Sequence, residues 1–254
     1  MRNLRVLFLL AFVSTPAGAY AETGEAAWLR YARLDPSAVQ RIQREIPRSI
    51  VTFESAAPIQ KAREELVAGL RGMAGIDPAA TERLPADGAI VAGTLARIRQ
   101  VSPDLMPAGT LQTDGFWLKA STSKGARFLV IAGESERAVL YGAFALLRAM
   151  ARGESVAALD ERDAPYAPLR WVNEWNNIDG SIERGYGGRS IFWDGGHIRE
   201  DLSRVNEYGR LLASIGINGI SINNVNANPL VLSPEFVPQI ARVADMPELR
   251  LSVP

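Results

Sequence analysis

The sequence predicts an α/β protein in two parts: a layered α/β accessory domain and, after it, the first strands and helices of a (β/α)₈ TIM barrel. β-rich runs alternate with runs of helical period along most of the chain. A charged, proline-containing stretch at Asp160–Pro168 separates the two parts, and strands behind it end in polar residues. Such alternation is typical of sheets covered by helices. We place the accessory domain at residues 22–159 and the start of the barrel at residues 169–254.

Residues 1–21 have the order of a secretory signal peptide. Arg2 and Arg5 precede the apolar run Val6–Val13, and small residues follow in the A-x-A pattern at Ala17–Ala19. The apolar run is too short to span a bilayer as a permanent helix. We therefore predict a secreted or periplasmic protein, and we find no later stretch of the sequence that is apolar enough for a membrane span.

The composition is that of an ordinary globular protein, with 47% hydrophobic and 22% charged residues in a chain of 254. Basic and acidic residues number 28 each, so no basic excess indicates a nucleic acid partner. The absence of cysteine excludes thiol nucleophiles and Cys-based metal sites. His197 is the single histidine, which leaves no metal cluster and no specific Ser–His pair, and we expect it at the surface or in a cap.

The elements of the accessory domain are predicted from local patterns. In chain order they are a helix at Ser37–Glu45, a strand at Ser49–Ser55, a helix at Pro58–Met73, a strand at Gly88–Thr94, a hairpin of Gly115–Ala120 with Arg127–Ala132, and a helix at Glu134–Arg152. The last helix has a broad apolar stripe that includes Val139, Ala143 and Leu146, and Gly153 would end it. The polar residues Ser121–Gly125 form the turn of the hairpin.

Behind Asp160–Pro168, which we interpret as a linker, the runs follow the βαβ order of a parallel sheet. Strands are expected at Leu169–Trp175, Ile220–Val225 and Leu249–Val253, with helices at Arg199–Ser214 and Pro234–Val243. Only 86 residues follow Pro168, whereas a closed barrel takes about 250 residues. Since three strands cannot close a barrel, we expect a fragment or a natural truncation of a larger protein.

The segment Trp171–Ser190 is the densest cluster of chemically active residue types. It contains two tryptophans, three asparagines, three acids and two arginines within twenty residues. A tryptophan face can stack on a sugar ring, while amides and carboxylates bind its hydroxyls. Asn173, Glu174 and Trp175 would lie at the carboxyl end of the first barrel strand, where barrel enzymes place their sites. The pattern therefore indicates a carbohydrate site.

These residues also carry a family resemblance. The stretch RWVNEWNNIDGSIERGYGGRSIFWDGG, which begins at Arg170, resembles the signature of the α-glucuronidases of glycoside hydrolase family 67. The upstream ERAVLYGAFALLRAM and the downstream LLASIGINGISINNVNANP are similar to the corresponding family segments. The resemblance covers most of the chain behind residue 21 and is most specific at Arg170–Asp194. It implies that this stretch opens the catalytic barrel.

The resemblance implies an activity as well. Family members remove glucuronic acid or its 4-O-methyl ether from xylo-oligosaccharides in xylan catabolism, by inverting hydrolysis of an α-1,2 bond and without a metal or other cofactor. Inversion needs two carboxyl groups about 6.5–9.5 Å apart, which in the family come from later strands, so we expect no catalytic residue in this chain. On the motif match, Trp175 and Val225 form the wall around the sugar. Full-length members are implied to be homodimers.

Other interpretations of the same residues stay open. Glu174 and Asp179 could form an acid/base pair, but hydrogen bonding to substrate or a structural pairing with Arg170 or Arg184 is favoured. Glu174 is therefore expected to bind substrate. Asn223 and Asn224, at the end of the second barrel strand, either bind sugar hydroxyls or turn the chain. The alternative for the whole chain is a catalytically inactive remnant that at most binds oligosaccharide.

Overall fold

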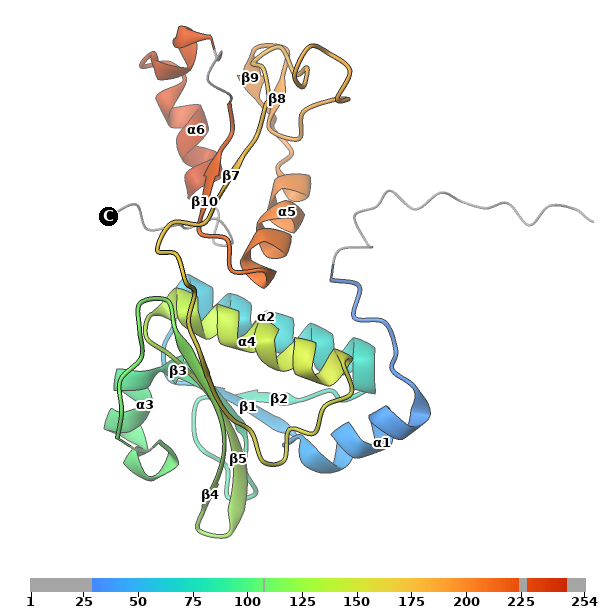
Figure 1. Cartoon of the computed structure of the whole chain (residues 1–254), viewed down its shortest axis with the longest axis vertical. Coiled ribbons are helices and arrows are strands. Elements are labelled where there is room, and N and C mark those ends of the chain that lie inside the picture. Colours follow the sequence, from blue (N-terminus) through green and yellow to red (C-terminus); the bar gives the residue numbers. More distant parts are fainter. Residues whose placement is uncertain (1–28, 107, 224–227, 246–254) are drawn as a thin grey trace, which may run out of the picture.

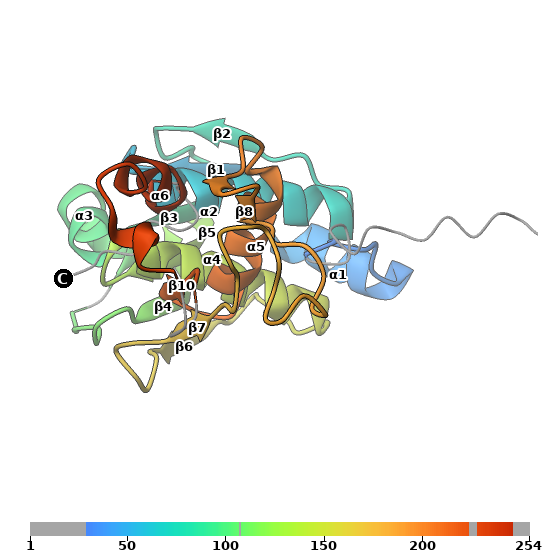
Figure 2. The same ribbon diagram turned by 90° about the horizontal axis from the view of Figure 1, so that it is seen from above.

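The computed structural model describes residues 29–106, 108–223 and 228–245. The predicted signal peptide at residues 1–21 and the predicted strand at Leu249–Val253 lie outside these ranges. Within them, no helix is long and apolar enough to cross a membrane. Two parts follow each other along the chain, and the second sits above the helices α2 and α4 of the first (Figures 1 and 2).

The first part is a six-stranded sheet with helices. Its elements are α1 (Pro36–Glu45), β1 (Ser49–Thr52), α2 (Ala57–Gly69) with a π-helical end (Leu70–Ala74), β2 (Ala79–Thr81), β3 (Ile90–Thr94), α3 (Leu95–Val101), a 3₁₀ turn (Pro103–Leu105), β4 (Phe116–Ser123), β5 (Ala126–Gly133), α4 (Glu136–Ala151) and β6 (Asp160–Asp163). The strand order is β2-β1-β3-β5-β4-β6. β2, β1, β3 and β5 run parallel, while β4 pairs antiparallel with β5 and β6.

Apolar side chains fill both faces of this sheet. On one face, Ile50, Ile90 and Ile131 pack with α2 and α4, whose helices lie side by side in Figure 1. On the other face, Val91 and Val130 join Leu95 and Ile98 of α3 in a second cluster. Alternate strand residues point to opposite faces, so these continuous apolar runs mark strands that are buried on both sides. The mixed α/β class is confirmed.

The ends of the helices follow from their capping residues. Asp35 accepts hydrogen bonds from the amides of Ser37 and Ala38 at the start of α1, where Pro36 takes the first helical position. Ser135 caps α4 by accepting from the amide of Ala138. Gly153, with φ of +73°, follows its end. The predicted helices, the hairpin and the strands β1 and β3 are confirmed to within a few residues at each end.

The interpretation of Asp160–Pro168 as a linker is wrong for its first four residues. Asp160–Asp163 form the edge strand β6, paired with β4. The indole Nε1 of Trp117 donates to Asp160 Oδ1 at 2.6 Å, and the Arg162 guanidinium lies 3.5 Å from the centre of the Trp117 ring. An exposed edge strand can consist of charged residues because only its backbone must pair. The composition of Asp160–Asp163 therefore does not distinguish this strand from a loop.

The second part is smaller and contains short strands. Its elements are β7 (Trp171–Asn173), β8 (Trp193–Asp194), β9 (His197–Ile198), α5 (Ser203–Ser214), β10 (Gly219–Ser221), a 3₁₀ turn (Pro229–Leu232) and α6 (Val237–Ala244). β7 and β10 form a parallel pair, with α5 between them in the sequence. Phe192, Trp193, Val205 and Leu212 form the core of this part. One βαβ unit occurs in many α/β folds, so the barrel stays a prediction.

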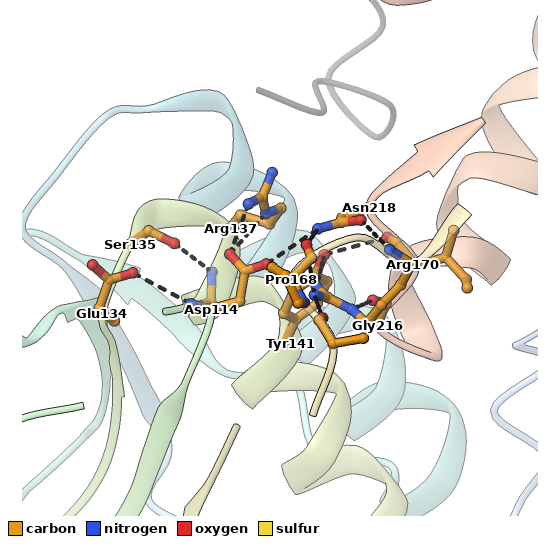
Figure 3. A network of polar contacts seen from close by, with 12 residues as sticks. Asp114, Glu134, Ser135, Arg137, Tyr141, Pro168, Arg170, Gly216 and Asn218 are labelled. Carbon is orange, nitrogen blue, oxygen red and sulfur yellow. Dashed lines mark hydrogen bonds and ion pairs between the residues drawn. The ribbon is translucent and has the colours of Figure 1, made fainter. Parts of the chain in front are cut away.

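A polar network at the junction joins the two parts (Figure 3). Asp114, which is 2% exposed, accepts from the guanidinium groups of Arg170 at 2.8 Å and Arg137 at 2.7 Å. Asn218 donates to the Pro168 carbonyl at 2.7 Å and accepts from the Arg170 amide at 2.8 Å. Burial raises the pKa of Asp114, but the hydrogen bonds and charges of the two arginines outweigh it and hold that pKa below its ordinary value. The chain therefore enters β7 from an anchored position.

Two further contacts between the parts involve α5. Arg210 pairs with Glu65 of α2, its Nε lying 2.5 Å from Glu65 Oε1. Glu65 is 5% exposed and also accepts from the hydroxyl of Tyr31, whose pKa is raised by burial and by this carboxylate. Arg148 of α4 donates to the Ser214 carbonyl at 2.6 Å. These bonds seat α5 on the α2/α4 layer.

Candidate functional site

The carboxyl ends of β7 and β10 bring together polar residues that are far apart in the sequence. The Glu174 amide donates to the Ser221 carbonyl at 2.8 Å, which continues the pairing of the two strands by one residue. The Asn223 side chain donates to the Asn176 carbonyl at 3.1 Å. The residues that follow β7 and β10 therefore lie next to each other, as expected at the carboxyl ends of parallel neighbouring strands.

Glu174 is held by a residue of the helix between the two strands. The Tyr208 hydroxyl of α5 donates to Glu174 Oε1. Burial, together with this hydrogen bond to a carboxylate, raises the pKa of Tyr208, so the phenol keeps its proton and remains a donor. One oxygen of Glu174 is therefore oriented by the fold.

Trp175 presents its indole to solvent. Its side chain is 46% exposed, whereas Trp193 in the core of the same part is 0% exposed. The Trp175 backbone is fixed, since its carbonyl accepts from the Glu183 amide at 2.8 Å. A half-exposed indole on a fixed backbone offers a flat apolar face, and such faces can stack on sugar rings.

The loop behind Trp175 is organised by its own polar side chains. Asp179 Oδ1 accepts from both the amide and the hydroxyl of Ser181, at 2.8 and 2.7 Å. These hydrogen bonds lower the pKa of Asp179. Asn177 donates to the Ser181 hydroxyl and to the Glu183 carbonyl. Asp179 therefore acts as a turn residue, and this geometry does not support an acid/base pair with Glu174.

The predicted structural pairing of Glu174 or Asp179 with Arg170 or Arg184 is wrong, because both arginines contact other carboxylates. Arg170 points to Asp114 in the first part of the chain, and Arg184 lies 3.9 Å from Glu183. The partner of Glu174 is Tyr208 instead. Tyr208 lies on the broad apolar side of its helix, where spacing favours a core role, so no local signal identifies it as a site residue.

Of the five predicted site residues, three lie at this end of the strand pair: Glu174, Trp175 and Asn223. Asn224 and Val225 fall outside the described residues. Asn176, which the prediction omitted, is 2% exposed, and among the described residues its Nδ2 has no hydrogen-bond partner. A buried donor without a partner costs free energy, and here it lies beside the three gathered residues.

The chain matches two models of one family. The model described as the N-terminus of glycosyl hydrolase family 67 matches residues 27–146, and the model described as the middle domain of that family matches residues 149–250. The chain belongs to glycosyl hydrolase family 67. It carries the N-terminal portion of a family member, and the resemblance drawn from Arg170–Asp194 is confirmed.

Curated relatives agree with this assignment. The chain is 43% identical over 241 residues to the probable alpha-glucuronidase A of Aspergillus fumigatus, a match that covers 94% of the chain and 28% of the relative. It is 40% identical over 258 residues to the alpha-glucuronidase of Hypocrea jecorina, covering 97% and 29%. The chain thus spans less than a third of the length of these relatives.

Among solved structures, the chain is similar to a family GH115 4-O-methyl-alpha-glucuronidase with specificity for decorated arabinogalactans. The TM-score is 0.48 and the identity 14%, over 69% of this chain and 25% of that one.

Proposed function

We propose that this family 67 chain forms the front part of an α-glucuronidase, which releases glucuronic or 4-O-methylglucuronic acid from xylo-oligosaccharides by inverting hydrolysis of an α-1,2 bond. Residues 169–254 would open its (β/α)₈ barrel. The family assignment and the names of the relatives support the glucuronidase activity. The substrate and the inverting course rest on the resemblance of the Arg170–Asp194 stretch.

The observation that carries the proposal is the grouping of Glu174, Trp175 and Asn223 at the carboxyl ends of β7 and β10. The Trp175 indole would stack on the uronic acid ring and, with Val225, surround its O-methyl group. Glu174, oriented by Tyr208, would accept hydrogen bonds from ring hydroxyls. We propose that this group forms one wall of the sugar pocket.

We assign the acid and the base of the reaction to strands that follow in full-length relatives. An inverting hydrolase needs a protonated carboxyl group and a carboxylate separated by about 6.5–9.5 Å. Glu174 is bound by Tyr208, and Asp179 is bound within its own turn, so both fit binding and structural roles better. On the basis of the predicted signal peptide we propose that the enzyme acts outside the cytoplasm, and homodimerisation of the full-length protein stays a prediction.

The experiment is a titration of the purified chain with an aldouronic acid, 4-O-methylglucuronosyl-xylotriose, followed by calorimetry and by analysis of released uronic acid. We expect weak binding, which Trp175→Ala reduces about tenfold, equivalent to roughly 1.4 kcal/mol. Trp171→Ala is the matched control, since Trp171 is 59% exposed at the opposite end of β7.

This experiment tests two claims separately: that Trp175 belongs to the pocket wall, and that the acid and the base lie on later strands. Unchanged affinity of Trp175→Ala would remove that residue from the pocket wall. Release of methylglucuronic acid by the 254-residue chain would show that the acid and the base lie within it. Binding without release supports the proposed wall.

A further inference from the structure

A polar hollow lies in the first part of the chain, and neither Glu174, Trp175 nor Asn223 is among its lining residues. It has a volume of about 840 Å³ and is lined by the segments that follow β1 and β2, and by side chains of α2 and α3. Ligand sites in proteins have volumes of this order. No residue of the proposed sugar wall lines it.

The position of the hollow is the one at which open α/β sheets bind ligands. β1 and β3 are parallel neighbours, yet the helices that follow them cover opposite faces of the sheet. Ile59 and Leu66 of α2 pack on one face, and Leu95 and Ile98 of α3 on the other, so the two connections diverge (Figure 1). Such a divergence opens a crevice outside the carboxyl ends of the strands.

Three arginines line this crevice: Arg63 from α2, Arg83 from the connection after β2, and Arg97 from α3. Within the described residues, none of the three forms an ion pair with a carboxylate; Arg97 donates to the neutral amide oxygen of Gln100 at 2.7 Å. Guanidinium groups that line one hollow without pairing to a carboxylate suit a carboxylate or another anion as ligand.

Glu54 also lines the crevice, but its carboxylate is hydrogen-bonded within the protein. Its oxygens accept from the amide of Thr94 at 2.8 Å and from the Thr94 hydroxyl at 2.9 Å. This bridge joins the end of β1 to the end of β3 and fixes the floor of the crevice. Glu54 therefore stabilises the shape of the crevice and does not neutralise the arginines by direct pairing.

The remaining lining matches a hydroxyl-rich ligand. Gln60 donates to the Glu54 carbonyl at 3.0 Å, which leaves its amide oxygen for a ligand hydroxyl. Glu82 is exposed and offers a further acceptor, and Phe53 is a half-buried aromatic ring at the same crevice. Guanidinium, amide, carboxylate and ring surface together recognise an acidic sugar better than a compact inorganic anion.

We propose that the crevice between the ends of β1 and β3 is a second, non-catalytic binding site for oligosaccharides that carry uronic acid carboxylates. The choice of a sugar uronate over other organic carboxylates rests on the proposed function of the chain. The site would hold an acidic side group of the polymer with Arg63, Arg83 and Arg97, at a distance from the pocket in which the bond is cut.

The test uses the full chain with Trp175→Ala, so that binding at the proposed sugar wall is weakened and the signals of the crevice are followed separately. Nitrogen-15 NMR spectra follow the Nε–Hε signals of Arg63, Arg83 and Arg97 and the amide of Thr94 during titration with 4-O-methylglucuronosyl-xylotriose. We expect saturable shifts of these signals. Adding Arg63→Ala and Arg97→Ala together should weaken binding at least fivefold.

Neutral xylotriose and inorganic phosphate serve as comparison ligands, and Arg71→Ala is the matched control variant, because Arg71 pairs with Asp77 at the surface outside the crevice. Shifts with the aldouronic acid alone, lost in the double arginine variant and kept in Arg71→Ala, support the site. Equal shifts with neutral xylotriose, binding of phosphate only, or unchanged affinity of the double variant would overturn it. Failure of the sugar wall would instead appear as unchanged affinity when Trp175→Ala is compared with wild type.

Discussion

Asp114 is the residue on which the junction between the two parts depends. It is buried and receives two guanidinium groups, from Arg137 in α4 and from Arg170 at the entry to β7. Removal of the negative charge would leave two cations facing each other in a poorly solvated place. The junction is therefore sensitive to a change of one functional group that leaves the shape of the side chain intact.

Asp114→Asn should lower the free energy of unfolding by about 3 kcal/mol, because it breaks a buried ion pair while keeping the side-chain volume. Denaturant unfolding measures the change. Asp77→Asn is the control, since the Asp77–Arg71 pair is exposed and its loss should cost less than about 1 kcal/mol. Equal effects of the two variants would contradict the role of Asp114.

The same carboxylate predicts a dependence on pH. The pKa of Asp114 is lowered in the folded chain, so its contribution to stability is complete above the unfolded value of about 4 and is lost as pH falls through the lowered pKa. We expect the unfolding free energy of the wild type to decrease below about pH 4 more steeply than that of Asp114→Asn. Parallel acid unfolding curves for the two proteins would argue against this linkage.

At the scale of elements, the approach of β3 to β5 depends on a glycine. Gly88 has φ of +98°, and a Cβ atom there would lie 1.9 Å from the Arg127 carbonyl oxygen. Gly125 in the turn of the β4–β5 hairpin has φ of +81° but no heavy atom within 4 Å of a Cβ. Both positions therefore need a positive φ, but only Gly88 lacks the space for a Cβ atom.

Gly88→Ala should therefore destabilise the chain by about 2 kcal/mol more than Gly125→Ala, because the backbone conformation disfavours alanine at both sites while only Gly88 adds a clash with backbone. Thermal or denaturant unfolding of the two variants gives the difference. If the two substitutions had the same effect, the contact between Gly88 and Arg127 would not constrain the sheet.

Elements also differ in how well the sequence predicts them. The helices α2 and α4 and the β4–β5 hairpin are predicted because their apolar spacing and turn residues are local. The strand β6 is missed because its residues are all charged and their partners in β4 lie 41 to 47 residues earlier in the chain. The strands β2, β8 and β9 have two or three residues, too few for a period to appear.

At the scale of the molecule, the second part depends on the first for its position. Arg170 and Arg210 each form an ion pair with a buried carboxylate of the first part. The parallel pair β7–β10 is short, and two strands alone are marginally stable. Contact with the α2/α4 layer therefore contributes to the order of the proposed sugar wall.

Replacing both arginines, as Arg170→Ala with Arg210→Ala, should release the second part. We expect amide hydrogen exchange in α5 and β10 to accelerate by at least tenfold, while α4 and β3 keep their protection, because the second part has a core cluster of its own and contributes Ala213 of α5 to the core of the first part. Arg199→Ala, which removes an exposed contact with Asp194, is the control. Uniform acceleration across both parts would indicate a single cooperative unit.

The sequence by itself determined the mixed α/β class, most of the longer elements and the family, since these depend on periodicity and on the continuous motif at Arg170–Asp194. It also identified Glu174, Trp175 and Asn223 as residues that end barrel-like strands. Only the tertiary structure decided the partner of each charged group: Tyr208 for Glu174, Asp114 for Arg170, and none of the carboxylates for the arginines of the crevice among the described residues. The physical reason is that the packing of elements distant in the sequence determines which charged side chains come within contact of each other. The local spacing of residues in the sequence carries no information about these contacts.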